Sequence, residues 1–135
     1  MAYPDFLKSL ECLDNKRLTK QRVEARQIYD VLTGKTKTKA WIHHPALLMW
    51  KGYEDALALY YNYSLALFTI RGFKNIKLTP IDIKNVIKYP SWLGDDRLHS
   101  SHRANLKRKN ISFYGKYNWS ESPDMPYFWP VKNNS

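Results

Sequence analysis

The sequence predicts an all-α protein, with one domain over 1–135 built from three to four helices around a central buried helix. An irregular, aromatic-rich segment is expected to follow at the C-terminus. Apolar residues recur at helical spacing over 14–32, a second apolar stretch runs from 44 to 72, and no segment shows sustained period-two alternation. With 135 residues and 44% hydrophobic composition, the chain can bury one core but has no room for a second domain of ordinary size.

The first helix is expected from Asp14 to Leu32. Asp14 or Ser9 can cap it, and Gly34 is well placed as a left-handed stop. Its apolar residues fall on one face: Leu18, Ala25, Ile28, Tyr29 and Leu32. One side of this helix therefore faces the core and the other side faces solvent.

The central helix is expected to begin at His44 and Pro45, since proline suits the first position of a helix. It continues to Arg71 and Gly72, and Gly52 is a point where it kinks or splits. Its apolar residues run almost all round the helix, which predicts that it is buried.

Two shorter helices are predicted further along the chain. Thr79-Pro80-Ile81-Asp82 has the residues of a helix start and predicts a short helix to about Ile87. Ser100 or Ser101 can open a fourth helix that ends at Lys109. The segment from Tyr117 onward is expected to be irregular because Pro, Ser and Asn interrupt it repeatedly.

The charge of the chain is strongly positive and unevenly distributed. There are 22 Lys and Arg against 12 Asp and Glu, a net charge of +10. Eight basic residues and two acids lie from Lys16 to Lys39, and five basic residues with no acid lie from Arg103 to Lys116. Two such clusters favour double-stranded DNA as the partner over merely solvated surfaces, since each phosphate contact releases counterions.

Other partners and locations are less compatible with the sequence. No apolar stretch reaches the roughly 18 residues of a membrane span, and the N-terminus lacks the pattern of a secretion signal. Cys12 is the only cysteine, so no internal disulfide is expected. We therefore expect a cytoplasmic protein without a membrane partner.

Aromatic residues are interleaved with the second basic cluster and continue beyond it. They are Phe113, Tyr114, Tyr117, Trp119, Tyr127, Phe128 and Trp129. Such rings can stack on bases or sugars. About half of them are expected to belong to the core instead, because a small helical domain must cover its ends.

Glu24 stands out as an acid among basic residues. Arg17, Lys20, Glu24 and Gln27 share one side of the first helix. Glu24 can simply pair with Lys20 at i,i+4, a contribution of a few tenths of a kcal/mol. A carboxylate within a DNA-facing positive region weakens phosphate binding, however, which points to a chemical role.

The histidines do not predict a metal site. His99 and His102 are three residues apart, but no HExxH, CxxC or comparable ligand set accompanies them. We expect no metal and no cofactor. His44 before Pro45 is expected to cap a helix or contact a phosphate, and His102 to contact a phosphate or a base edge.

Ordered runs along the chain resemble one protein family. These are YPDFLKSLECLDNKRLTKQRVEARQI, WIHHPALLMWKGYEDALALYYN, RGFKN, PSWLGDDRLHSSHRANLKRKNISFYGKYNW and PDMPYFWP. Together they resemble the pyrimidine dimer DNA glycosylase family of endonuclease V type, in a bacterial and phage subgroup. The resemblance implies an all-α, monomeric, metal-free DNA repair enzyme in a bacterium or a phage-infected cell.

The resemblance also implies a mechanism, namely glycosidic bond cleavage at a damaged pyrimidine followed by strand nicking through β-elimination. An amine forms a Schiff base with the sugar while a glutamate assists. Glu24 matches that glutamate, and the amine would belong to Ala2 after removal of Met1, with Lys16 and Lys20 as alternatives. An α-amino group suits this role because its pKa is lower than that of lysine.

The expected DNA contacts combine the basic clusters with the resemblance. They are Lys16, Arg17, Lys20, Arg22, Arg26, His43, His44, His102, Arg103, Asn105, Lys107, Arg108 and Lys116. Two other functions remain open from the residues themselves. One is a non-catalytic DNA-binding or phage–host interaction protein on the same fold, and the other is a small nucleotide-binding protein.

Overall fold

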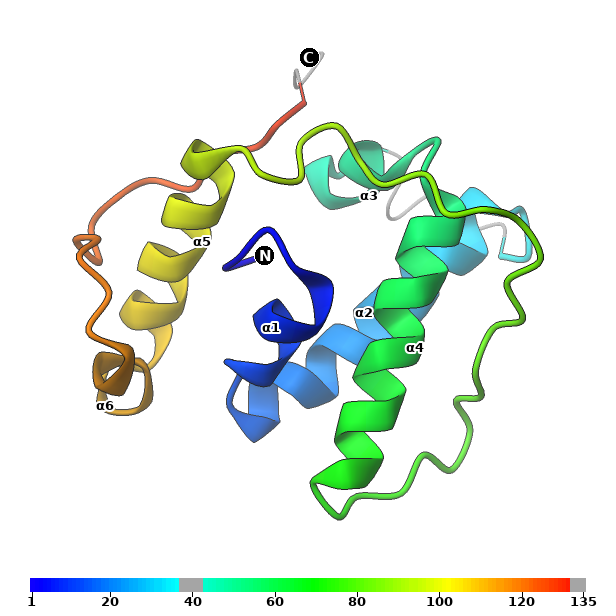
Figure 1. Ribbon diagram of the computed structural model, residues 1–135, viewed down its shortest axis with the longest axis horizontal. Helices are drawn as coiled ribbons and strands as arrows, with labels where there is room; N and C mark the ends of the chain where they lie inside the picture. Colours follow the sequence, from blue (N-terminus) through cyan, green and yellow to red (C-terminus); the bar gives the residue numbers. More distant parts are fainter. Residues whose placement is uncertain (37–42, 132–135) are drawn as a thin grey trace.

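The computed structural model describes residues 1–36 and 43–131, and these residues contain helices and loops but no strand. The all-α prediction is confirmed. The described residues contain six α-helices, two of them long, rather than the three to four expected. Figure 1 shows α5 (Asp96–Lys109) and α6 (Ile111–Tyr114) on one side, α2 (Asn15–Leu32) and α4 (Glu54–Ile70) on the other, and the N-terminal segment between them.

The long helix α2, Asn15–Leu32, follows the prediction closely. The Asp14 side chain caps it by accepting a hydrogen bond from the Arg17 amide at 3.3 Å. Gly34 follows the helix with a φ of +78°, a conformation that glycine adopts without strain. Leu18, Ala25 and Ile28 are buried on the face that packs on α4.

The predicted central helix is split at Gly52. It forms α3, Pro45–Trp50, and α4, Glu54–Ile70, and Gly52 between them has a φ of +89°. The longer part, α4, is the buried central helix that the sequence predicts. Its buried residues are Ala56, Leu57, Ala58, Tyr60, Tyr61, Ser64, Leu65 and Phe68.

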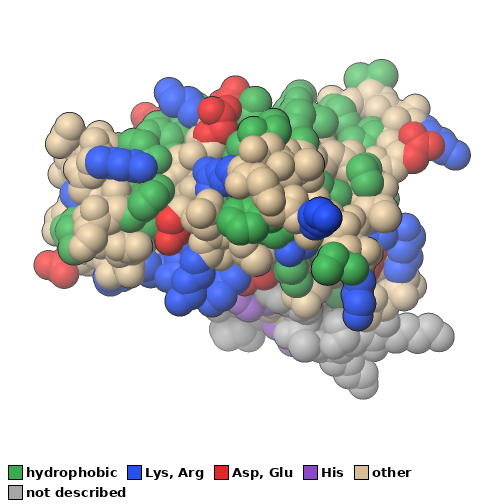
Figure 2. Space-filling view, turned by 90° about the horizontal axis from the view of Figure 1, so that it is seen from below, with side chains coloured by type: hydrophobic (Ala, Val, Ile, Leu, Met, Phe, Trp, Pro, Cys, Tyr) green, Lys and Arg blue, Asp and Glu red, His purple; other side chains and the backbone are tan. Residues whose placement is uncertain are grey.

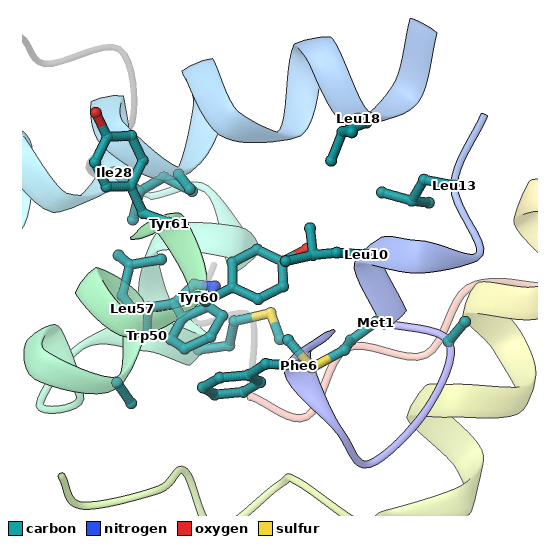
Figure 3. Close-up of a cluster of buried hydrophobic side chains, with 14 of the residues drawn as sticks. Met1, Phe6, Leu10, Leu13, Leu18, Ile28, Trp50, Leu57, Tyr60 and Tyr61 are labelled. Carbon is teal, nitrogen blue, oxygen red and sulfur yellow. The ribbon is translucent and has the colours of Figure 1, made fainter. Parts of the chain in front are cut away.

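A short N-terminal helix, α1 at Phe6–Glu11, was not predicted because six residues are too few to show periodicity. Asp5 caps it by accepting a bond from the Lys8 amide at 2.7 Å. Phe6 anchors the helix on the core, with ring centroids 5.5 Å from Tyr60 and 5.8 Å from Trp50. Figure 3 shows Met1 at the edge of this same cluster.

The short helix predicted from Thr79 to about Ile87 does not form, and this prediction was wrong. The segment runs beside α4 as an extended strap and then crosses to α5 (Figure 1). Asn62 holds it by donating to the Ile81 carbonyl at 2.9 Å and accepting from the Ile81 amide at 2.8 Å. The Thr79 carbonyl accepts from the Tyr61 hydroxyl at 2.8 Å. Backbone groups that a helix would pair internally are thus already bonded to side chains.

The fourth predicted helix exists but begins earlier. It is α5, Asp96–Lys109, and Asp95 rather than a serine caps it, accepting from the Arg97 amide at 3.0 Å. The short helix α6, Ile111–Tyr114, and a 3₁₀ turn at Gly115–Tyr117 follow. Residues 118–131 have no regular structure, as predicted. Within the described part of the chain, no helix combines the length and apolar character needed to cross a membrane.

The strap gives a prediction about stability. Replacing Asn62 by Ala leaves the Ile81 amide and carbonyl without their partner, so we expect a loss of about 1–3 kcal/mol in the free energy of unfolding. Urea denaturation measures this loss. Asn85→Ala, which removes one exposed bond of 3.3 Å to Asp55, is the matched control. Equal stability of both variants would show that Asn62 does not hold the strap.

Candidate active site

One cavity of about 450 Å³ lies where the two sides of the molecule meet. The N-terminus, α2, α3, α4, α5 and the C-terminal segment all contribute to its wall. The lining residues are Met1, Leu13, Arg17, Lys20, Gln21, Glu24, Ile28, His44, Ala46, Met49, Trp50, Tyr60, His102, Asn105, Leu106, Lys109, Tyr127 and Trp129. We refer to this cavity as the central pocket.

The α2 side of the central pocket carries Glu24 among cations. Arg17, Lys20, Glu24 and Ile28 line it because residues three or four apart share a helix face. Glu24 and Lys20 are exposed to solvent, whereas Ile28 is buried deeper. Gln27, expected on the same side, is exposed but does not line the pocket.

The start of the chain contributes Met1 to the wall of the pocket. Met1 is 8% exposed and Ala2 1% exposed, so both belong to the core. Burial lowers the pKa of the Met1 amine from its ordinary value near 8 to about 4, which leaves the amine neutral at pH 7. Met1, which carries this neutral amine, and Glu24 both line the central pocket.

The α5 side contributes His102, Asn105 and Lys109. Burial lowers the pKa of His102 well below its usual range. Burial also lowers the pKa of Lys109, as does the positive charge of Arg17 across the pocket. Lys109 was not among the predicted site residues, although its place in the second basic cluster marked it as a candidate.

Aromatic rings from distant segments form the remaining wall. The Tyr127 and Trp129 centroids lie 4.5 Å apart, and the His44 ring meets Trp129 edge-on at 5.9 Å. His102 Nδ1 lies 3.1 Å from the Tyr127 hydroxyl. His44 also caps α3, accepting from the Ala46 amide at 3.0 Å. Tyr127 and Trp129 thus lie at the site, as two of the seven aromatic residues that the sequence pointed to.

The other aromatic residues near the C-terminus pack against one another. The Tyr114 and Tyr117 rings both stack on Trp119, at 5.9 Å and 5.0 Å. Phe113 meets Tyr114 edge-on at 4.9 Å. Phe128 lies under the Arg97 guanidinium at 4.4 Å. These residues stabilise the fold and do not line the central pocket.

The cations that line the pocket have no acidic partner among the residues that the structure describes. The ion pairs in the described residues are Arg26–Asp30, Arg97–Asp95 and Arg103–Glu121. None of these involves Arg17, Lys20 or Lys109. Moreover, Arg17 Nε is buried without a hydrogen-bond partner in the described part of the structure. Such groups are available to bind an anion.

Arg22 and Arg26 lie on a different face of α2. The Arg22 guanidinium packs on the Phe68 ring at 4.0 Å, and Arg26 Nε donates to Asp30 at 3.1 Å. Arg26 also donates to the Thr79 carbonyl at 3.1 Å. Both side chains therefore join α2 to α4 and the strap, and neither lines the central pocket.

Three predicted DNA contacts on α5 instead hold the C-terminal segment. Arg103 pairs with Glu121 at 3.0 Å, and Lys107 donates to the Trp119 and Glu121 carbonyls. Arg108 donates to the carbonyls of Pro123 at 2.7 Å and Met125 at 3.2 Å. These contacts fix the segment that delivers Tyr127 and Trp129 to the pocket.

The remaining predicted contacts lie outside the pocket. Lys16 and His43 are exposed, and Lys116 lies over the Phe113 ring at 3.8 Å. Lys37 and Lys39 of the first cluster lie outside the described residues. Figure 2 shows Lys and Arg side chains along the lower edge of one face, beside a histidine. Within the described residues, no group of three or more His, Cys, Asp or Glu could hold a metal ion.

Comparison with known proteins identifies the family. The family model for pyrimidine dimer DNA glycosylases matches residues 2–80, which include α1 to α4 and Glu24. No curated protein and no solved structure gives a significant match to the chain. The α5 and C-terminal walls of the central pocket lie outside the matched residues. Because the match covers more than half of the chain, this protein belongs to the pyrimidine dimer DNA glycosylase family.

Proposed function

We propose that this protein is a DNA glycosylase with AP lyase activity, acting on damaged or modified pyrimidines such as cyclobutane dimers in double-stranded DNA. One observation carries the proposal beyond the family. The central pocket is lined by Met1, whose terminal amine is buried, by Glu24 and by cations without acidic partners. An amine nucleophile, a proton-transfer group and phosphate-binding groups are what this reaction needs.

The proposed nucleophile is the terminal amine, that of Ala2 once Met1 is removed. Its nitrogen attacks C1′ of the sugar, the glycosidic bond breaks, and the bonding electrons leave with the base. Loss of protons from nitrogen and opening of the sugar ring give a Schiff base at C1′. Burial at the start of the chain supports this role: Ala2 is 1% exposed, and in the chain that retains Met1 burial lowers the pKa of the Met1 amine to about 4.

Glu24 is proposed to move the protons of this sequence. The amine must lose protons as the Schiff base forms, and C2′ must lose one before the 3′ phosphate leaves with its bonding electrons. A carboxylate at the rim of the pocket, open to solvent, can accept these protons and pass them on. Arg17, Lys20 and Lys109 would bind the flanking phosphates.

The damaged nucleotide is proposed to leave the base stack and enter the pocket, as base-directed enzymes generally require. Tyr127, Trp129 and His44 offer ring faces and edges in the pocket that Glu24 also lines. Stacking of a base on an aromatic side chain contributes about 1–3 kcal/mol. The pocket volume of about 450 Å³ is within the usual range for small-molecule sites.

Glu24→Gln tests the chemistry. We expect turnover to fall at least about 100-fold while DNA affinity stays the same or increases, because a negative charge leaves a phosphate-binding surface. Borohydride trapping on a duplex with an abasic site or a cyclobutane dimer measures turnover. Equilibrium binding to the same duplex measures DNA affinity. Glu11→Gln, an exposed carboxylate on α1, is the matched control.

Two outcomes of this experiment would redirect the proposal. Unchanged turnover in Glu24→Gln would exclude Glu24 from the chemistry. Tight binding without trapping by the unmodified protein, on any damaged duplex, would favour a non-catalytic DNA-binding protein on the same fold.

The pocket cations predict the salt dependence of binding. Arg17→Ala and Lys109→Ala should each weaken DNA binding and reduce the slope of log K against log salt by about 1. Titration between 50 and 200 mM salt, roughly the range over which such slopes are measured, provides the check. Lys8→Ala, outside the central pocket, should keep the original slope. Equal slopes in all variants would remove the pocket from the DNA-binding surface.

Mass mapping of the trapped complex identifies the nucleophile. We expect the sugar fragment on the N-terminal residue, because that amine is buried whereas Lys16 and Lys20 are exposed. Digestion after borohydride reduction and sequencing of the modified peptide gives the answer. A label on Lys16 or Lys20 would contradict the terminal-amine mechanism while leaving a lyase function in place.

A further inference from the structure

The α5 wall of the central pocket contains a side-chain amide that is held from outside the pocket. Asn105 lines the pocket about one helical turn from both His102 and Lys109, which line it too. Its Oδ1 accepts a hydrogen bond from Arg108 Nη2 at 2.8 Å. Arg108 does not line the pocket, and its Nη1 donates to two carbonyls of the C-terminal segment at 2.7 Å and 3.2 Å.

This contact decides which end of the Asn105 amide remains available. A guanidinium carries donors only, so the amide oxygen must face Arg108, and turning the amide over would set its nitrogen against another donor. No hydrogen bond among the described residues uses Asn105 Nδ2, and this nitrogen is not one of the buried side-chain atoms that lack a partner there. Solvent therefore reaches Nδ2. Asn105 has a free donor, whereas its acceptor is already in use.

Aromatic rings lie next to this part of α5. The Tyr127 hydroxyl lies 3.1 Å from His102 Nδ1, and the Tyr127 and Trp129 centroids are 4.5 Å apart. Both rings line the central pocket together with Asn105. A planar base that stacks on this aromatic wall therefore has a hydrogen-bond donor of α5 within the same pocket.

The position of Glu24 sets the orientation in which a base would enter. Glu24 lies on α2 and Asn105 on α5, and Figure 1 shows these helices on different sides of the molecule. In the proposed function, Glu24 acts at C1′ and C2′ of the sugar, so ring nitrogen N1 of the base lies toward α2. Position 4 of a pyrimidine is opposite N1 across the ring. The group at position 4 would therefore point toward the α5 wall.

We propose that Asn105 determines specificity by donating a hydrogen bond from Nδ2 to a carbonyl oxygen at position 4 of the extruded base. This inference rests on the proposed function and names its substrate class. Lesions derived from thymine or uracil carry a carbonyl at position 4 and are accepted. Lesions derived from cytosine carry an amino group there, which is also a donor and leaves Nδ2 without a partner.

Two duplexes that differ in one base test this assignment. One contains 5-hydroxyuracil and the other 5-hydroxycytosine, each opposite guanine, and the two lesions differ at position 4 and in the proton on the adjacent ring nitrogen. The measured quantity is the ratio of the two binding affinities. The cost of extruding each base is the same for every variant, so a change in this ratio between variants reports a contact with the protein. The Glu24→Gln background keeps the lesions intact during binding.

Asn105→Asp reverses the hydrogen-bonding character of the amide. One carboxylate oxygen can keep the contact with Arg108, and the other places an acceptor where Nδ2 lies. We expect the affinity ratio to shift by at least about tenfold toward the cytosine lesion, because hydrogen bonds to charged groups are the stronger ones. Asn105→Leu removes both groups, and the preference for the uracil lesion should fall about 2- to 10-fold.

Gln21→Glu is the matched control for charge. It adds the same negative charge to the α2 side of the central pocket and leaves Asn105 in place. Its affinity for the two duplexes should change by the same factor. A structural role of Asn105 would likewise weaken both complexes alike. An unchanged ratio in folded Asn105→Asp, or an equal shift of the ratio in Gln21→Glu, would overturn the assignment.

The outcome is separable from that of the proposed function because the affinity ratio requires no chemistry. If the unmodified protein traps no damaged duplex, the proposed function fails, and the ratio still decides whether Asn105 contacts position 4. If both duplexes are trapped but the ratio is the same in every variant, the glycosylase activity stands and the role of Asn105 is wrong. Because Asn105→Asp can retain the Arg108 contact, it decides the matter even if Asn105→Leu fails to fold.

Discussion

Burial of the first residues of the chain is the constraint on which the rest of the structure depends. Met1 and Ala2 lie in the core between α5 and the α2–α4 pair, where unpaired peptide groups would cost several kcal/mol. His99 and Arg103 supply the missing partners, and Glu121 then holds Arg103 in place. The same bonds that satisfy the buried backbone also direct the start of the chain toward the central pocket.

The basic residues divide according to what they contact, which changes the meaning of the net charge of +10. Arg26 and Arg103 pair with acids, and Lys107 and Arg108 bind carbonyl oxygens of the C-terminal segment. These cations stabilise the fold. Others, including Arg17 and Lys109, line the pocket without an acidic partner among the described residues. Total charge therefore indicates a polyanionic partner, but only the contacts reveal which cations remain available to it.

Local signals in the sequence were sufficient for much of the fold. Asp14 and Gly34 mark the ends of α2 because capping and left-handed turns depend on neighbouring residues alone. The strap was missed because Asn62, nearly twenty positions away, bonds its backbone. The candidate site shows the same difference between local signals and contacts of long range. Glu24 and its helix face follow from periodicity, but the roles of Arg103 and Lys109 depend on contacts between distant segments, which spacing does not encode.

Residues from near both ends of the sequence line the central pocket, among them Met1 and Trp129. Contacts such as those joining Ala2 to Arg103 or Tyr3 to Trp119 span about 100 positions or more. Pairings of such long range form late, because closing a long loop costs entropy before the contact contributes. During synthesis, α1 to α4 can begin to associate while the C-terminal segment is still inside the ribosome. A nascent chain would therefore bear the Glu24 side of the pocket before it acquires the α5 and aromatic walls that enclose it.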